Sequence, residues 1–235
     1  MPRFSMIAFD ADDTLWHNER LYAAAQARFK HLLAHYHDPQ WIEERLYEAE
    51  MRNLPHFGYG IKSFALSMIE TAVELTEGRV SGQDILTLVE TAKAMLAADV
   101  ELLDHVATTV RALAATHTLM IITKGDLLDQ ESKVARSGLA ASFDHIEIVS
   151  QKTPESYAAV LRRVGVTPDA FLMVGNSLRS DILPVLALGA QAVYVPYALT
   201  WAHEVVEPPP ADQPGFHEIA HLGLLPGLVQ ALESA

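Results

Sequence analysis

The spacing of hydrophobic residues changes along the chain, and each spacing predicts a different kind of element. The stretch "FSMIAF" is short and apolar and stops at Asp10, which indicates a buried strand over residues 5–10. From residue 18 to about residue 95, apolar residues recur three or four positions apart, which predicts four successive amphipathic helices. Beyond about residue 100, helical spacing alternates with short apolar runs. We therefore expect one strand, a block of helices, and then alternating helices and strands.

The alternating part contains four further predicted strands, each an apolar run that ends at a polar residue, a glycine or a proline. They are "HTLMIIT", "HIEIVS", "AFLMVG" and "QAVYVP". Helices are predicted between them, one opened by Thr153 as N-cap with Pro154 after it, and a last helix follows the Pro-rich loop "EPPPADQPG". Buried strands that alternate with helices are typical of a parallel sheet covered on both faces. The sequence therefore predicts an α/β fold with a Rossmann-like parallel sheet.

The helical block interrupts this α/β pattern directly after its first strand. Its helices follow one another without an intervening strand, and the loop "NLPHFGYG" separates the second helix from the third. We therefore predict an α/β core made of residues 1–16 and 100–235, with an inserted all-helical domain of residues 17–99.

Composition limits the classes of partner that this chain can have. The net charge of −13 is unfavourable for binding nucleic acid or an anionic membrane surface, because both require an excess of Lys and Arg. The chain has no cysteine, which excludes disulfides, thiolate nucleophiles and Cys-ligated zinc. No apolar run approaches the roughly 18 residues of a membrane span, and the opening residues lack a signal-peptide pattern. We expect a cytoplasmic protein without nucleic-acid or membrane partners.

Chemically reactive residues follow four of the predicted strands. These are Asp10 with Asp12, then Thr123-Lys124-Gly125, then Lys152, and finally Asn176 with Asp181 in "GNSLRSD". Taken singly, each has an ordinary structural interpretation as a solvated turn, a surface lysine or a helix cap. Ligands of open parallel sheets, however, bind beyond the carboxyl ends of the strands. Because all four groups fall at that end, we expect them to line one crevice.

With these motifs in this order, the chain resembles the haloacid dehalogenase (HAD) superfamily. The likeness rests on "DADDT" after an apolar strand, then Thr123, Lys152 and "GNSLRSD", and it extends over essentially the whole chain. It is strongest to the magnesium-dependent phosphatases with a helical, C1-type cap after the first motif. The resemblance implies a hydrolase of phosphoric monoesters with Mg²⁺ as cofactor, and it makes residues 17–99 a cap that closes over the site and selects the substrate.

The same resemblance assigns roles to the residues at the strand ends. Asp10 would attack the phosphoryl group and become an aspartyl phosphate, while Asp12 would act first as general acid and then as general base. Mg²⁺ would take a carboxylate oxygen of Asp10, the carbonyl of Asp12 and a ligand from the loop that carries Asn176 and Asp181. The phosphoryl oxygens would be bound by a second set of groups, comprising Thr123, Lys124, Gly125 and Lys152.

Two positions depart from the pattern of the superfamily. Asp13 stands where glycine is common, and we interpret it as a turn residue because Asp tolerates unusual φ values. Asn176 stands where many members have Asp, which leaves open whether Asn176 or Asp181 is the direct metal ligand; we favour Asp181. We predict that Asn176→Asp keeps activity and lowers the magnesium concentration needed for half-maximal rate. An unchanged magnesium titration would mean that Asn176 is only a helix cap.

Substrate selection is the part of the function that the sequence describes least. His56, Tyr59 and Lys62, in "NLPHFGYGIKSF", are candidate specificity residues, although aromatic side chains there could equally pack the cap. Trp16 and His17, where the chain leaves the core, are interpreted as hinge packing.

Several other functions are alternatives to the phosphatase. A 2-haloacid dehalogenase would use Asp10 to attack carbon, but needs neither Asp12 as acid nor magnesium. A receiver-like signalling domain would lack the helical insertion. A phosphomutase or phosphotransferase would differ only in the acceptor, and a catalytically silent phosphate-binding protein would be expected to have lost some of these groups. We expect a small phosphorylated metabolite as substrate; which one, and the oligomeric state, remain open.

Overall fold

The computed structural model describes residues 3–210 and 212–234, and the chain divides into two compact units. One comprises Met1–Glu19, Val100–Lys124 and Gln130–Ala235, and we call it the sheet unit. The other, the helical unit, comprises Arg20–Asp99 and Gly125–Asp129. We predicted a functional core of residues 1–16 and 100–235 and an inserted functional domain of residues 17–99. That assignment of functional domains stays a prediction.

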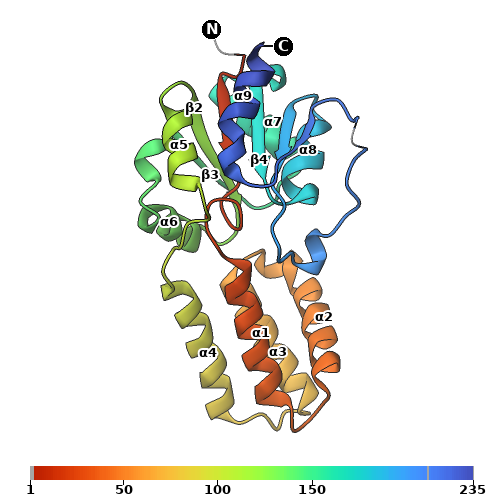
Figure 1. The fold of residues 1–235 in the computed structure, drawn as a ribbon. Helices are drawn as coiled ribbons and strands as arrows, with labels where there is room; N and C mark the ends of the chain where they lie inside the picture. The colour runs from red at the N-terminus through yellow and green to blue at the C-terminus, as the bar shows by residue number, and fades with distance from the viewer. Residues whose placement is uncertain (1–2, 211, 235) are drawn as a thin grey trace. The chain divides into compact units, whose positions relative to one another are not determined.

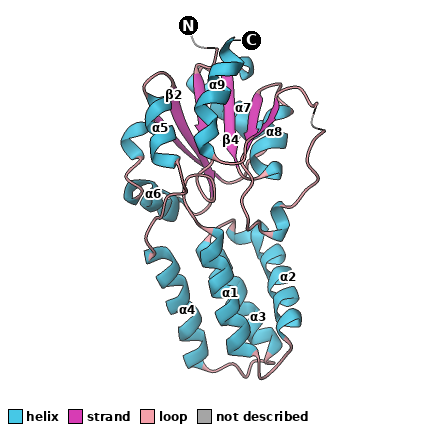
Figure 2. Ribbon diagram, in the orientation of Figure 1, coloured by secondary structure: helices cyan, strands magenta, loops and turns pink. Residues whose placement is uncertain are grey.

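The sheet unit contains a six-stranded, wholly parallel sheet, which confirms the predicted α/β class (Figures 1 and 2). The strand order is β3-β2-β1-β4-β5-β6. The strands are β1 (Met6–Phe9), β2 (Thr118–Lys124), β3 (His145–Val149), β4 (Phe171–Gly175), β5 (Gln191–Tyr194) and β6 (Phe216–Glu218). The sequence pattern missed only β6, since its three residues follow a Pro-rich loop and are only partly buried.

The central position of β1 explains its unbroken apolar sequence. Phe9 pairs in register with Ile121 of β2 on one side and with Val174 of β4 on the other. All four β1 residues are buried, because helices cover both faces of the sheet and leave no face for polar side chains.

Each face of the sheet has its own hydrophobic core. On one face, apolar residues of α5 (Val106–Ala114), α6 (Leu127–Arg136) and α9 (Leu225–Ser234) pack on the strands. On the other, α7 (Pro154–Val164), the π-helical turn η3 (Leu178–Ile182) and α8 (Leu183–Leu186) do so. As predicted, Thr153 caps α7: its hydroxyl accepts from the N–H of Ser156, and the serine hydroxyl accepts from the N–H of Thr153.

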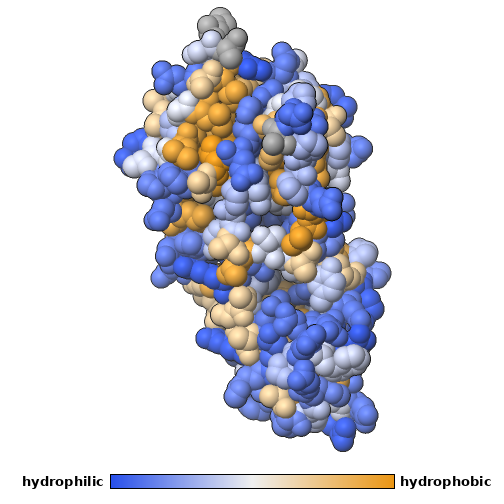
Figure 3. Space-filling model, turned by 45° about the vertical axis from the view of Figure 1, so that its right-hand side comes forward, coloured by the Kyte–Doolittle hydropathy of each residue, from blue (hydrophilic) through white to orange (hydrophobic). Residues whose placement is uncertain are grey.

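The helical unit contains the four predicted helices, α1 (Glu19–Leu33), α2 (Pro39–Phe57), α3 (Ile61–Leu75) and α4 (Gly82–Ala97). They bury a third core of their own, which includes Phe29, Ile42, Leu46, Phe64 and Met68. In the view of Figure 3, the surface of this unit is mostly hydrophilic. No helix among the described residues is long and apolar enough to span a membrane.

One predicted loop is partly wrong. "NLPHFGYG" was expected to be irregular throughout, but α2 continues through Pro55 to Phe57. Pro55 sits in the last turns of the helix, so its missing N–H removes only one late hydrogen bond. Asn53 is buried and donates to Ser67 Oγ (3.1 Å) and Glu70 Oε2 (2.7 Å), which binds this end of α2 to α3. A tertiary contact therefore overrides the local loop signal.

Candidate active site

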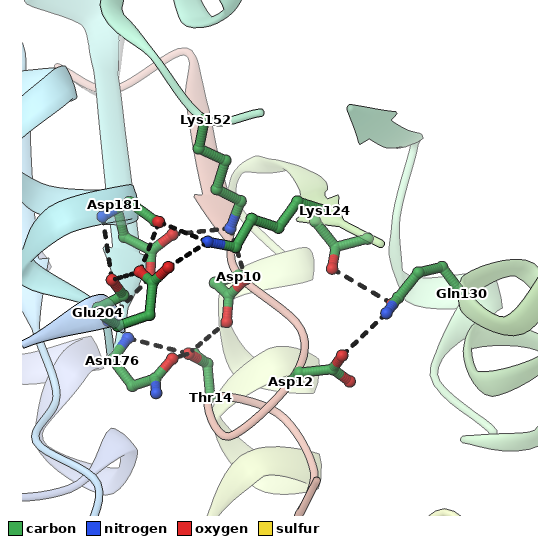
Figure 4. A network of polar contacts seen from close by, with 12 residues as sticks. Asp10, Asp12, Thr14, Lys124, Gln130, Lys152, Asn176, Asp181 and Glu204 are labelled. Atoms are coloured by element: carbon green, nitrogen blue, oxygen red, sulfur yellow. Dashed lines mark hydrogen bonds and ion pairs between the residues drawn. The ribbon is translucent and has the colours of Figure 1, made fainter. Parts of the chain in front are cut away.

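The reactive residues of the sheet unit gather beyond the carboxyl ends of its strands, as parallel topology requires (Figure 4). Asp10 follows β1 directly, Thr123 is the penultimate residue of β2, and Gly175 ends β4. Figure 4 shows Asp10, Lys152, Asp181, Asn176 and Thr14 converging, although they come from three distant stretches of sequence.

Lys152 is the positive centre of this arrangement. Its Nζ donates to Asp10 Oδ1 at 2.5 Å and to Asp181 Oδ1 at 2.7 Å, and all three residues are buried. Burial disfavours the Lys152 ammonium, but Asp10 and Asp181 outweigh burial and raise its pKa above the ordinary value. For Asp10, burial raises the pKa to about 7 despite the opposing charge of Lys152. The predicted nucleophile and cation therefore form one buried ion pair.

Asp181 is held by the backbone that leads into η3. Its Oδ2 accepts from the N–H of Ser177 at 3.0 Å, and Ser177 Oγ in turn accepts from the N–H of Ser180 at 3.0 Å. A Cβ atom on Gly175 would lie only 2.3 Å from Asp181 Oδ2. The glycine at the end of β4 is therefore what allows Asp181 to approach the strand end.

Thr14 joins the loop after β1 to the end of β4. Its hydroxyl lies 3.0 Å from Asp10 Oδ2, to which it can donate, and it accepts from the N–H of Asn176 at 3.1 Å. Thr14 therefore holds the first loop against the end of β4.

The carboxylate of Asp12 is directed toward Gln130, not toward the Asp10–Lys152 pair (Figure 4). Its Oδ1 accepts from Trp16 Nε1 at 2.7 Å, its Oδ2 accepts from Gln130 Nε2 at 2.8 Å, and Lys133 Nζ lies 2.7 Å from both oxygens. Gln130 also accepts a hydrogen bond from the Thr123 hydroxyl at 3.2 Å. No signal in the sequence marks Gln130 and Lys133, because nothing but the packing of α6 brings them to Asp12.

Lys124 takes part in a second ion pair, with a residue that the sequence did not single out. Its Nζ donates to Glu204 Oε1 at 2.5 Å and to Ser180 Oγ at 2.8 Å. Glu204 lies in the short turn Ala202–Glu204 and also accepts from Ser177 (2.5 Å) and Ser180 (2.6 Å). Burial opposes its ionisation, but Lys124 and the serines lower its pKa to about 2. No local signal in the sequence marks this glutamate.

Asp13 adopts a left-handed backbone with φ of 62°, in line with its interpretation as a turn residue. Its carboxylate accepts from the N–H groups of Asn18 (2.8 Å) and Glu19 (3.0 Å), at the start of α1. Burial raises its pKa to about 6. Gly125 also has a positive φ, of 144°, which is a backbone conformation that mainly glycine adopts.

The three candidate specificity residues lie around the junction of α2 and α3. His56 is in the last turn of α2, Tyr59 follows that helix, and Lys62 is in the first turn of α3. Lys62 Nζ donates to both oxygens of Asp126, at 2.9 and 3.0 Å, within the helical unit. Their role in recognition stays a prediction.

The two residues interpreted as hinge packing lie at the end of the loop that follows β1. Trp16 is buried and bonded to Asp12, while His17 Nδ1 lies 2.7 Å from the Tyr197 hydroxyl.

The oxygen atoms around Asn176 fit a hard divalent cation. One of the two outer atoms of the Asn176 amide faces inward. It lies 3.2 Å from the Asp12 carbonyl and from Asp10 Oδ2, and 3.1 Å from the Thr14 hydroxyl. Oxygen ligands of this kind suit Mg²⁺. Four carboxylates (Asp10, Asp12, Asp181 and Glu204) are paired with three ammonium groups (Lys124, Lys133 and Lys152), which leaves excess negative charge.

The candidate metal ligands around Asn176 are not a cluster of acidic or histidine side chains alone. Within residues 3–210 and 212–234, no group of three or more His, Cys, Asp or Glu side chains is placed to hold a metal ion. Asp10 is the carboxylate that the Asn176 side chain faces, so any metal site here would depend on a backbone carbonyl and an amide as well.

A family model and a solved structure both match this chain and point to the same protein family. A family model described as haloacid dehalogenase-like hydrolase matches residues 4–189. A haloacid dehalogenase-like family hydrolase from Xanthomonas campestris is 43% identical, with a TM-score of 0.89 over 99% of this chain and 93% of that one. No curated protein matches the chain.

Two other solved structures are more distant. A 2-haloacid dehalogenase from Pseudomonas syringae pv. tomato is 25% identical, with a TM-score of 0.65 over 97% of this chain and 99% of that one. A protein from Haemophilus somnus, named as a predicted phosphoglycolate phosphatase, is 15% identical, with a TM-score of 0.64 over 98% of this chain and 100% of that one. At that identity the second likeness shows the fold alone.

Proposed function

Because the chain belongs to the haloacid dehalogenase-like hydrolases, we propose that it is a magnesium-dependent phosphohydrolase of small phosphomonoesters. The observation that supports this best is a buried Asp10 carboxylate held by Lys152 and Thr14, with a second carboxylate, Asp12, two residues away. A nucleophile paired with a separate proton carrier is what hydrolysis through an aspartyl phosphate requires.

In the first step, an oxygen of Asp10 forms a bond to phosphorus, and the bond from phosphorus to the substrate's bridging oxygen breaks. Asp12 gives a proton to that departing oxygen. Lys152 offsets the negative charge, and the Thr123 hydroxyl with the backbone N–H groups around Lys124 and Gly125 binds the phosphoryl oxygens. Bound Mg²⁺ would supply further positive charge against the phosphoryl group.

In the second step, water attacks the phosphorus of the aspartyl phosphate and Asp12 takes its proton. The bond between phosphorus and Asp10 then breaks and releases inorganic phosphate. Both oxygens of Asp12 are engaged by Trp16, Gln130 and Lys133. Asp12 must therefore rotate away from these donors to exchange protons with substrate and water.

The decisive experiment is a screen for phosphate release from sugar phosphates, nucleotides, phosphoglycolate and flavin mononucleotide, with Mg²⁺ or with EDTA. We expect release with at least one substrate in Mg²⁺. The rate should fall by more than about a thousandfold in EDTA, which removes the metal, and in Asp10→Asn, which removes the nucleophile. Asp38→Asn is the matched control, since Asp38 only caps α2 and should leave the rate unchanged. Full activity in EDTA, or in Asp10→Asn, would contradict the proposal.

A second candidate is a 2-haloacid dehalogenase, in which Asp10 displaces halide from carbon and water then hydrolyses the ester. Two observations favour it: Asp12 is held toward Lys133, and a neutral Asn176 faces Asp10. The 25% identity to a 2-haloacid dehalogenase also supports it. Chloride release from 2-chloropropionate in EDTA, lost in Asp10→Asn and without phosphatase activity, would replace the first proposal with this one.

Charge and composition support the rest of the proposal. The partner is a small phosphorylated metabolite and not nucleic acid or membrane, in line with the net charge of −13. We further propose that the helical unit acts as the cap and that the protein works in the cytoplasm, since a chain that forms no disulfide fits a reducing compartment.

A further inference from the structure

The side-chain amide of Asn176 can face Asp10 and Asp12 with either of its two outer atoms. The positions of the nitrogen and the oxygen exchange when the amide turns by half a revolution about its last bond. Three oxygens converge on the inward position: Asp10 Oδ2, the Asp12 carbonyl and the Thr14 hydroxyl.

With the nitrogen inward, every group at this point is satisfied. The amide donates to the Asp12 carbonyl and to Asp10 Oδ2 at 3.2 Å, and approaches Thr14 Oγ1 at 3.1 Å. Thr14 Oγ1 also accepts from the N–H of Asn176 at 3.1 Å and gives its own proton to Asp10 Oδ2 at 3.0 Å. The amide has two protons for three acceptors, so Thr14 Oγ1 shares one of them with a neighbouring oxygen, and no acceptor here is left facing only other acceptors.

With the oxygen inward, the same point becomes a cluster of oxygens. Thr14 has one hydroxyl proton, and two acceptors compete for it: Asn176 Oδ1 at 3.1 Å and Asp10 Oδ2 at 3.0 Å. The amide oxygen and the Asp12 carbonyl then face each other and Asp10 with no proton between them. Only a cation makes such an arrangement favourable.

We propose that Asn176 stands in for a cation: its NH₂ group neutralises Asp10 and the Asp12 carbonyl when no divalent ion is bound, and it turns its oxygen inward when one binds. The inference rests on the metal dependence in the proposed function. It gives Asn176 a role that aspartate could not perform, because a carboxylate at this point has no proton to donate.

The site thus remains stable without metal at the expense of metal affinity, since binding must first break the amide's hydrogen bonds. The substitution Asn176→Asp should reverse this balance between stability without metal and affinity for metal. It would place another carboxylate against Asp10, in a buried network that already has excess negative charge, and only a cation would relieve the repulsion.

Thermal unfolding of the full chain tests the idea without any substrate. In EDTA, Asn176→Asp should melt about 5 °C or more below the wild type, and about 10 mM Mg²⁺ should recover most of that difference while shifting the wild type by less than about 2 °C. Calorimetry should show Mg²⁺ binding at least about tenfold tighter to Asn176→Asp.

Asn53→Asp is the matched control. Asn53 is also buried and also donates to a carboxylate, that of Glu70 at 2.7 Å, but in the helical unit. It should lower the melting temperature in the same way, with no recovery in Mg²⁺. If Asn176→Asp melts like the wild type in EDTA, or if Mg²⁺ fails to restore it, the inference is wrong.

A spectroscopic measurement on the wild type decides the matter if Asn176→Asp does not fold. Side-chain amide signals in a ¹⁵N-labelled sample should include one, assigned to Asn176 by its absence in Asn176→Ala, that is slow to exchange in EDTA and moves when Mg²⁺ is added. A rapidly exchanging signal in EDTA would overturn the inference. Recovery by Mg²⁺ without phosphatase activity on any substrate would leave it standing and reject only the proposed function.

Discussion

At the scale of single residues, ionic partners decide which side chains of the site are fixed. Asp10 and Asp181 share Lys152. Glu204 pairs with Lys124 and accepts from Ser177, which caps the η3 turn, and from Ser180 within that turn. Each of these lysines comes from the end of a different strand, so the ion pairs also hold the loops that carry them. Positioning and charge balance are therefore achieved by the same contacts.

Glu204 permits a prediction about stability and pH. Its native pKa of about 2 lies below the ordinary value of 4.5, so the native state binds fewer protons than the unfolded state between these values. The stabilisation from Glu204 is therefore complete above pH 4.5 and is lost as the pH falls toward 2. Glu204→Gln should lower the free energy of unfolding by about 2 kcal/mol at pH 7, and by much less at pH 3.

Urea unfolding curves at the two pH values measure this difference. Glu90→Gln is the control, because Glu90 pairs with Lys93 on the exposed surface of α4 and should cost less than about 0.5 kcal/mol. An equal loss for Glu204→Gln at pH 7 and pH 3 would show that the effect is not ionic.

At the scale of elements, the end of β4 shows how a strand and the turn after it determine the site. The backbone leaves β4 at Gly175, and the η3 turn brings Asp181 back against that glycine. A side chain at position 175 would occupy the space of the Asp181 carboxylate. The local sequence "GNSLRSD" therefore works only with glycine first.

Gly175→Ala should displace Asp181 from Lys152 and lower kcat by about a hundredfold or more, since the new Cβ would lie 2.3 Å from Asp181 Oδ2. Gly165→Ala is the control: Gly165 ends α7 with φ of 71° and open space around its Cβ position. It should cost about 1 kcal/mol of stability through backbone strain and leave kcat unchanged. Comparable kcat values for the two variants would refute this account of Gly175.

At the scale of the whole molecule, the buried apolar residues that stabilise the fold form three separate hydrophobic cores. Two lie on the opposite faces of the sheet, and the third lies among α1, α2, α3 and α4, with no member from the strands. A core that contains only residues of the helical unit can lose structure without the loss of the sheet.

Phe29→Ala should therefore act within the helical unit. The side chain is fully buried there, and its loss should cost about 3 to 4 kcal/mol. Hydrogen exchange measured by mass spectrometry should speed up in α1 to α4 by at least about a hundredfold while the amides of β1 keep their protection. Equal acceleration in β1 would mean that the two units unfold together.

The sequence by itself determined the α/β class, the order of its elements and the family. Apolar runs with period breaks marked five of the six strands, and Thr153 marked the start of α7 by local capping chemistry. Parallel topology then implied that Asp10, Thr123, Lys152 and Asp181 would meet, because the carboxyl ends of parallel strands share one edge. These features depend on periodicity and on residues close in sequence.

Only the tertiary structure decided which groups touch. Gln130 and Lys133 reach Asp12 because of how α6 packs, and Glu204 reaches Lys124 from 80 residues away. The direction of the Asp12 carboxylate and the oxygens around the Asn176 amide likewise depend on distances between segments far apart in the chain. Such contacts leave no periodic or local signal, since burial and hydrogen-bond geometry are properties of the folded arrangement.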